Sequence, residues 1–233
     1  MMPFNRDAIK EGLFQQIAAD AEAKGLIKLS TAEEREASWR SLLAENPNAD
    51  GAVWVFAYGS LLWNPAIHVE QTVNARLEGY HRDFTLRTYI GRGSEQQPGL
   101  VLGLEDGLFC EGQALKIPAK KVESELSLLW AREMVSSAYI PTWLPMLTDQ
   151  AEPFYGIGFI MDKSYPHYAA NLSFEQRCHD LAFGEGSLGR AADYLFDTLT
   201  SLTEMGIEDA LLERYAERVK QLIAEHLALP KAD

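Results

Sequence analysis

The feature that most constrains the fold of this chain is a block of strand-like segments between two helical ends. The block begins at residues 52–57 (AVWVFA), an apolar run rich in β-branched and aromatic residues that predicts a buried strand. Further strands are expected at 68–73, 76–89, 99–104, 112–117, 138–147 and 154–161, and helices at 119–133, 173–183, 188–205 and 208–226. We therefore expect an α+β domain, a mostly antiparallel sheet curled into a small barrel with flanking helices.

Residues 1–50 differ from this block because their pattern is polar and helical. The modest apolar stripe of Leu13, Ile17 and Ala21 predicts one helix, and Thr31 with Glu34 has the form of a capping box that begins another. The segment 45–51 contains proline, asparagine and glycine and predicts a linker. The sequence thus predicts an N-terminal helical extension over 1–50 and a main domain over 51–233.

Charge and composition limit the possible partners. The formal net charge is −13 at pH 7, which disfavours nucleic acids and anionic membranes, although a local pocket can still bind a small anion. The two cysteines, Cys110 and Cys178, lack the spacing of a disulfide framework or a zinc site, and no apolar run reaches the roughly 18 residues of a membrane span. We expect a cytoplasmic protein with a small-molecule substrate and no obligatory protein partner.

One carboxylate lies on the core-facing side of the helix expected at 119–133. Glu133 follows Val122 by roughly three helical turns, so it continues the apolar stripe that Val122 begins. Burial and the negative end of the helix dipole would raise the pKa of Glu133, which suits a general base near neutral pH. A carboxylate that reaches solvent or pairs with a neighbour is the simpler alternative and stays open. Other charged residues fall off the stripe and are expected in solvent: Lys120, Lys121, Glu123, Glu125 and Arg132.

The first expected strand leads directly into the loop Tyr58-Gly59-Ser60-Leu61. Glycine permits close backbone approach, so consecutive N–H groups of this loop can form a nest for a carboxylate or an oxyanion, with the Ser60 hydroxyl as a further donor. An ordinary strand exit closed by Pro65 explains the same residues. The segment is not the Gly-x-Ser-x-Gly of a nucleophile elbow.

No other polar pattern assembles a competing site. The five histidines lack metal-ligand spacing, so we expect no metal, and no glycine-rich phosphate-binding motif occurs. Cys178, His179 and Asp180 match a nucleophilic triad by residue type only, because adjacent residues on a helix point in different directions.

Four segments in the same order resemble the motifs of the ChaC family of γ-glutamylcyclotransferases. They are 55–65 (VFAYGSLLWNP), 91–99 (GRGSEQQPG), 129–139 (LWAREMVSSAY) and 186–195 (GSLGRAADYL). The third is similar to the family segment that carries the catalytic glutamate. The resemblance runs from about Gly51 to beyond Leu202, and residues 1–50 resemble the N-terminal extension of bacterial members.

The resemblance implies an enzyme that cleaves glutathione into 5-oxoproline and cysteinylglycine without a metal or cofactor. The α-amino nitrogen of the γ-glutamyl group would attack its own γ-carbonyl carbon, with Glu133 as general base and then general acid. Substrate contacts are implied for Val55, Phe56, Ala57, Tyr58, Gly59, Ser60, Leu61, Tyr139 and Arg92. Simpler alternatives are a packed strand aromatic for Tyr139 and a solvated turn charge for Arg92.

Two departures from the family pattern stand out. Ala57 replaces the usual glycine, and its methyl group is expected to narrow the nest, while Gly189-Arg190 replaces a glycine-asparagine pairing. Two other functions stay open at this point. One is a cyclotransferase for other γ-glutamyl peptides or amines, and the other is a non-catalytic protein that binds γ-glutamyl compounds.

Overall fold

The structure is a computed structural model that describes residues 4–148 and 151–228. Five strands form a closed barrel in the order β1-β3-β2-β4-β5. The strands are β1 (Val53–Ala57), β2 (Gln71–Thr88), β3 (Gly99–Ile117), β4 (Tyr139–Thr148) and β5 (Ala151–Met161). Neighbours are antiparallel, except that β5 pairs in parallel with β1 and β3 and so closes the barrel. The predicted α+β class and the mostly antiparallel barrel are confirmed.

Strands β2 and β3 are longer than predicted. The sequence indicates two shorter strands within each, but the structure has one continuous antiparallel pair. The register shifts between Glu78 and Tyr80, where Gly79 has a φ of +82°, so the chain bulges and bends without leaving the sheet. At Gly107, a Cβ atom would lie 2.4 Å from Nδ1 of His81. Gly107 therefore lies at a close approach inside the continuous strand β3.

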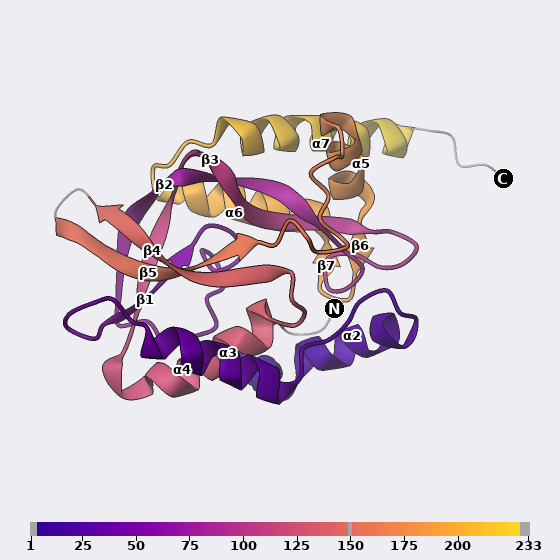
Figure 1. Ribbon diagram of the computed structural model, residues 1–233. Coiled ribbons are helices and arrows are strands. Elements are labelled where there is room, and N and C mark those ends of the chain that lie inside the picture. Colours follow the sequence, from indigo (N-terminus) through magenta and orange to yellow (C-terminus); the bar gives the residue numbers. More distant parts are fainter. Residues whose placement is uncertain (1–3, 149–150, 229–233) are drawn as a thin grey trace.

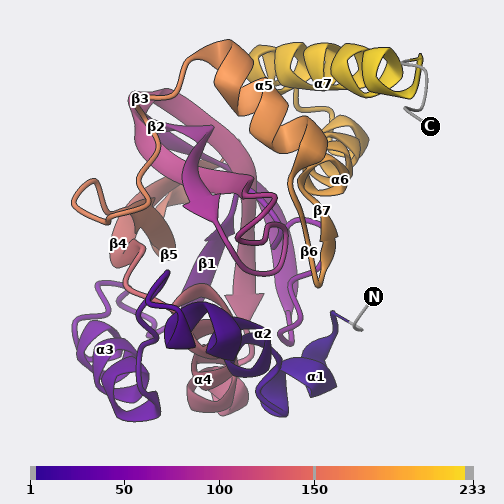
Figure 2. The same ribbon diagram turned by 90° about the vertical axis from the view of Figure 1, so that its right-hand side faces the viewer.

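Helices cover two opposite sides of the barrel (Figures 1 and 2). On one side lie α1 (Arg6–Lys10), α2 (Leu13–Ala23), α3 (Ala32–Ala44) and α4 (Val122–Glu133), and on the other α5 (Phe174–Phe183), α6 (Ala191–Glu204) and α7 (Ala210–Ala228). The predicted capping box at Thr31 is present. A short hairpin of β6 (Glu185–Gly186) and β7 (Gly189–Arg190) occupies the predicted start of α6.

Every residue of β1 is buried because its two faces meet two different cores. Trp54 and Phe56 belong to a cluster that extends to α5, α6 and α7, whereas Val53, Val55 and Ala57 belong to a cluster with α3 and α4. Successive side chains of a strand point to opposite faces, so one short apolar run serves both helical layers. The loop that follows β1 is thereby fixed between them.

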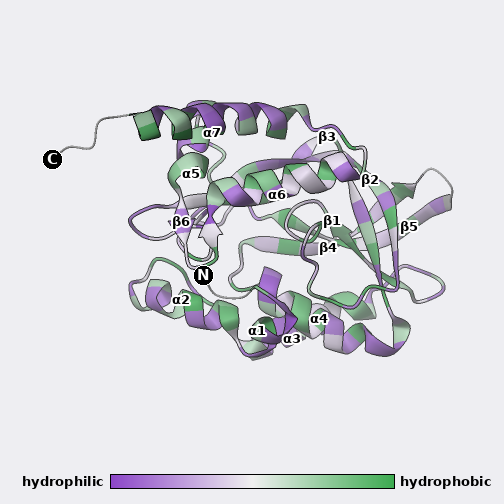
Figure 3. Cartoon of the chain, turned by 180° about the vertical axis from the view of Figure 1, so that it is seen from behind, coloured by the Kyte–Doolittle hydropathy of each residue, from purple (hydrophilic) through white to green (hydrophobic). Residues whose placement is uncertain are grey.

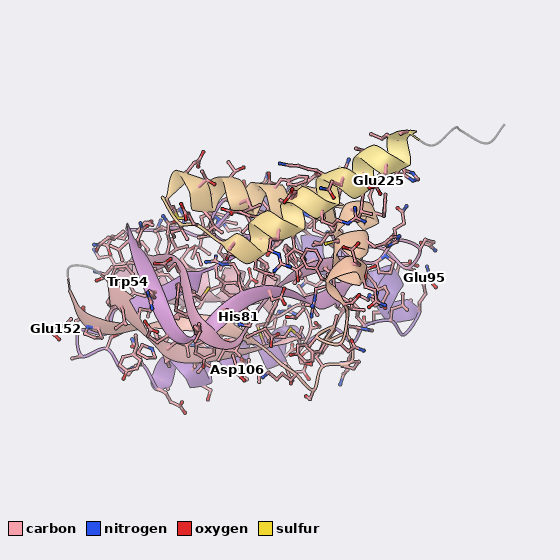
Figure 4. All side chains as sticks on the ribbon, turned by 90° about the horizontal axis from the view of Figure 1, so that it is seen from above. Trp54, His81, Glu95, Asp106, Glu152 and Glu225 are labelled. Atoms are coloured by element: carbon pink, nitrogen blue, oxygen red, sulfur yellow. The ribbon has the colours of Figure 1, made fainter. Side chains whose placement is uncertain are left out.

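Glu152 in β5 and Glu95 in the loop between β2 and β3 lie at opposite ends of the molecule (Figure 4). Nζ of Lys24, just after α2, lies 2.9 Å from a Glu95 carboxylate oxygen and ties the N-terminal helices to the latter end. Helices α6 and α7 each carry both hydrophobic and hydrophilic residues, as expected of helices that bury one face (Figure 3). Among the described residues, no helix combines the length and the apolar character needed to cross a membrane.

Candidate active site

A cavity lies where the loop after β1, the end of α4, the β2–β3 loop and α6 meet. The predicted site residues in its lining are Tyr58, Gly59, Ser60, Leu61, Arg92, Glu133 and Tyr139. Residues that are far apart in the sequence thus line one cavity. Further residues that the sequence did not indicate also line it.

Glu133 is the last residue of α4, and its side chain is 16% exposed, toward the cavity. The stripe that carries it is confirmed, because Leu126, Leu129 and Trp130 are fully buried. Burial raises the pKa of Glu133, and the neighbouring Arg132 guanidinium opposes the rise only in part. Oε1 lies 2.7 Å from Nε of Arg132 but accepts no well-aligned hydrogen bond from any described residue. Glu133 thus pairs with its neighbour Arg132, as the simpler alternative expected, and still has a raised pKa in the cavity lining.

Arg132 is buried, with a side chain only 3% exposed, so its predicted solvent position is wrong. The guanidinium donates to Oγ of Ser60 at 2.8 Å and to the backbone carbonyl of Asn64. It is buried because the loop after β1 packs on that side of α4, which helical periodicity alone cannot indicate. Since the Ser60 oxygen accepts this hydrogen bond, the Ser60 proton is free to be donated to a ligand.

The loop after β1 is held in place from two sides. A Cβ atom on Gly59 would lie 2.6 Å from the Tyr194 hydroxyl oxygen, so only glycine fits against α6 at this point. Behind the loop, Nη1 of the buried Arg82 donates to the Tyr58 carbonyl at 2.7 Å, and Nε of Arg82 lies 2.9 Å from Oδ2 of Asp209. A trans peptide points its carbonyl and its N–H in opposite directions, so this hydrogen bond turns the Gly59 N–H away from Arg82.

Three buried tyrosines surround the cavity, and all of them are neutral near pH 7. Burial, the largest cause, raises the pKa of Tyr58 and Tyr139 well above the ordinary value and that of Tyr194 to about 12. The Tyr58 hydroxyl donates to the Phe159 carbonyl and the Tyr139 hydroxyl to the Leu102 carbonyl, each at 2.8 Å. Because these protons are engaged, the two oxygens face a ligand as hydrogen-bond acceptors.

Arg92 is half-buried in the cavity wall, and burial lowers its pKa. Nη1 donates to the Arg190 carbonyl at 3.2 Å, and the guanidinium lies 5.7 Å from the centre of the Trp63 ring. Within the described residues it forms no ion pair. Arg92 is therefore not the solvated turn charge of the simpler alternative, and it retains donors for an anionic ligand.

Val55, Phe56 and Ala57 do not line the cavity. They are fully buried in the two cores described above, so the geometry does not support substrate contacts from their side chains. The expected narrowing by Ala57 is likewise not supported, because its methyl group packs in the core that β1 shares with α4. These residues position the loop that follows them.

Sequence reasoning missed several residues of the site. Tyr194 lay within a quoted motif but received no role, and Arg82 lay in a predicted strand with no local feature to distinguish it. Phe4, Phe14 and Ile27 line the cavity from the N-terminal 50 residues, for which no chemistry was expected. Only the folded arrangement brings these positions together.

The rival sites find no support in the described part of the chain. No cluster of three or more histidine, cysteine, aspartate or glutamate side chains is placed there to hold a metal ion. Cys110 and Cys178 are both free and buried, and burial raises the pKa of each thiol to about 11. Neither is a reactive thiolate near neutral pH.

Comparison with known proteins places the chain among relatives of one kind. The glutathione-specific γ-glutamylcyclotransferase of Escherichia coli (strain K12) is 39% identical over 198 residues, which span 85% of this chain and 85% of the relative. The glutathione-specific γ-glutamylcyclotransferase of Schizosaccharomyces pombe is 27% identical over 195 residues, 74% of this chain and 95% of the relative.

Solved structures agree on the fold. The crystal structure of a selenomethionine-labelled γ-glutamylcyclotransferase specific to glutathione, from yeast, superposes with a TM-score of 0.69 at 18% identity. The match covers 75% of this chain and 98% of the yeast chain. The family description "ChaC-like protein" matches residues 53–222, nearly all of the barrel and the helices that follow it. The chain therefore belongs to the ChaC-like protein family.

Proposed function

We propose that this protein is a glutathione-specific γ-glutamylcyclotransferase, which converts glutathione to 5-oxoproline and cysteinylglycine. The carrying observation is Glu133, a carboxylate of raised pKa that shares a cavity with the loop Tyr58-Gly59-Ser60-Leu61. Relatives from bacteria to fission yeast bear the name of this activity. The two free, buried cysteines support a cytoplasmic location, where thiols stay reduced.

In this proposal Glu133 moves the proton that the reaction requires. The α-amine of a γ-glutamyl group is mostly protonated at pH 7 and cannot attack a carbonyl until it loses a proton. The ammonium group loses one proton to solvent and its nitrogen bonds to the γ-carbonyl carbon. Glu133 takes a second proton from that nitrogen, and the amide bond to cysteine breaks. Glu133 then returns the proton to the departing nitrogen, so no water or cofactor is consumed.

The loop and the neighbouring side chains hold the γ-glutamyl group for this attack. The Gly59 N–H and the Ser60 hydroxyl are the proposed donors to the developing oxyanion, and one such donor is worth about 3–4 kcal/mol. The Tyr139 oxygen, as an acceptor, suits the substrate ammonium group. Arg92 supplies a cation for a substrate carboxylate. Holding a flexible substrate in a cyclising conformation removes much of the entropic barrier.

The test is release of 5-oxoproline from glutathione by the purified protein. Glu133→Gln is expected to retain the fold and to lose about 100-fold or more of the activity, because the amide cannot accept the proton. Glu123→Gln, a change at an exposed position of the same helix, is the matched control and should keep full activity. Substantial turnover in the Glu133→Gln variant would sink the assignment of the base.

The same assay distinguishes the two alternative functions. Faster turnover of γ-glutamyl-amino acids or γ-glutamylamines than of glutathione would indicate the broader cyclotransferase. Saturable glutathione binding without any 5-oxoproline would indicate the non-catalytic binder.

A further inference from the structure

The N-terminal part of the chain, residues 4–27, reaches into the cavity that holds Glu133. Phe4, Phe14 and Ile27 line it together with the residues of the main domain. Figures 1 and 2 show α2 on the same side of the barrel as α4, the helix that ends at Glu133. We propose that Phe4 is a positioning residue that excludes water from the Arg132–Glu133 pair. This inference rests on the proposed role of Glu133 as the base.

The ring of Phe4 packs directly on the cation that pairs with the base. The guanidinium carbon of Arg132 lies 4.8 Å from the centre of the Phe4 ring, a cation–π distance. Two more aromatic rings enclose Phe4 edge to face, Phe14 at 5.7 Å and Trp63 at 6.3 Å between ring centres. Phe4 thus covers one face of the Arg132 guanidinium within the cavity lining.

The backbone around Phe4 is fixed by polar contacts to the main domain. The Phe4 carbonyl accepts a hydrogen bond from Nδ2 of Asn64 at 2.7 Å, and Asn64 also accepts from Arg132. Two residues later, both terminal nitrogens of Arg6 bind the carboxylate of Glu125, whose side chain is 1% exposed. A buried, bidentate ion pair is a strong and specific anchor. The ring is therefore held in place by the fold itself.

The charged and titratable groups that face Glu133 come from four elements. Arg132 precedes it on α4, and the hydroxyls of Tyr58, Tyr139 and Tyr194 approach from the β1 loop, β4 and α6. The other ionisable side chains in the lining are Arg87, Arg92, Tyr165 and His167. Among the described residues of the lining, Glu133 is the only carboxyl group.

Loss of the Phe4 ring should lower the pKa of Glu133. Burial is the larger of the two influences on Glu133, and it raises the pKa. Water admitted by Phe4→Ala would stabilise the carboxylate and lower that pKa. A base must be deprotonated to act, so the acid limb of kcat/KM for 5-oxoproline release should move to lower pH. We expect kcat/KM at neutral pH to fall about tenfold as the pair becomes less well positioned.

A matched control separates this effect from a loss of packing. Phe174 is also half-buried beneath an arginine, with the Arg214 guanidinium 5.0 Å from its ring centre, but it does not line the cavity. Phe174→Ala should reduce stability and leave the pH profile unchanged. Phe4→Leu, which keeps most of the apolar volume, should restore most of the wild-type profile. Should Phe4→Ala fail to fold, Phe4→Val carries the same test.

A second measurement does not depend on turnover. Carbon-13 NMR of labelled glutamate carboxyl groups, with the Glu133 signal assigned by its loss in Glu133→Gln, gives the pKa of Glu133 directly. It should be lower in Phe4→Ala than in the wild type. An unchanged pKa together with an unchanged acid limb would overturn the role of Phe4 while leaving the cyclotransferase proposal intact. Absence of 5-oxoproline release from the wild-type protein would instead defeat the function, and the NMR titration would still decide the role of Phe4.

Discussion

Arg132 has two effects at the scale of single residues, because it touches both the base and the loop that faces it. It lowers the pKa of Glu133 in part, and it donates to the Ser60 hydroxyl oxygen. Arg132→Met removes the first effect, so the pKa of Glu133 should rise and the acid limb of kcat/KM should move to higher pH, opposite to the shift for Phe4→Ala. Removing one partner of a buried pair should also cost about 3–5 kcal/mol of unfolding free energy, measurable by urea titration. An acid limb that stays in place would contradict this assignment.

Helical periodicity predicted the inward position of Glu133 correctly but placed Arg132 and Glu125 in solvent, although both are buried. In each case the partner lies far along the chain, with Ser60 contacting Arg132 and Arg6 contacting Glu125. An apolar stripe reports only which face of a helix is hydrophobic. It carries no information about a distant polar group that makes burial of a charge tolerable.

At the scale of elements, the contact between the β1 loop and α6 depends on a missing side chain. Gly59→Ala would bring a methyl group against the Tyr194 hydroxyl, so we expect a loss of about 1–3 kcal/mol in stability and a large fall in 5-oxoproline release. The double variant Gly59→Ala with Tyr194→Phe removes the clashing oxygen and should recover most of the stability lost. Thermal unfolding of the single and double variants measures the coupling. Additive losses would show that the close approach is not what requires glycine.

The strands and helices were largely predictable, because the periodicity of apolar residues within a short segment indicates which of the two it forms. The barrel, the order of its elements and the three C-terminal helices follow the predicted pattern closely. The continuous β2–β3 pair was not predicted. Strand β2 crosses the expected gap at 74–75, and β3 crosses the expected gap at 105–111, where Gly107 approaches His81 closely. A glycine in the sequence is compatible with the end of a strand and with a close approach inside a strand, and only the opposing residues decide between the two.

At the scale of the whole molecule, the N-terminal helices are joined to the domain through Glu125. Burial alone would raise the pKa of this carboxyl group, but hydrogen bonds from Arg6 and from the His68 backbone and ring lower it from 4.5 to about 2. A depressed pKa in the folded state gives stability that is fully present above about pH 4.5 and is lost as the pH falls toward 2. The size of that shift corresponds to about 3 kcal/mol.

Glu125→Gln should therefore lose up to about 3 kcal/mol of unfolding free energy at pH 7, and its stability should fall less steeply than that of the wild type between pH 4.5 and 2. Urea titrations across this range measure both quantities. Glu123→Gln is the matched control, because Glu123 lies on the same helix, is 67% exposed and is 3.5 Å from Arg40, so its loss should stay within about 0.5 kcal/mol. If Glu125→Gln and the wild type lost stability in parallel from pH 4.5 to 2, the Arg6–Glu125 pair would not be what holds the N-terminal helices on the domain. In that case, contacts other than the Arg6–Glu125 pair would have to hold Phe4 in the cavity lining. The stability of the protein at acid pH therefore also tests how Phe4 is held there.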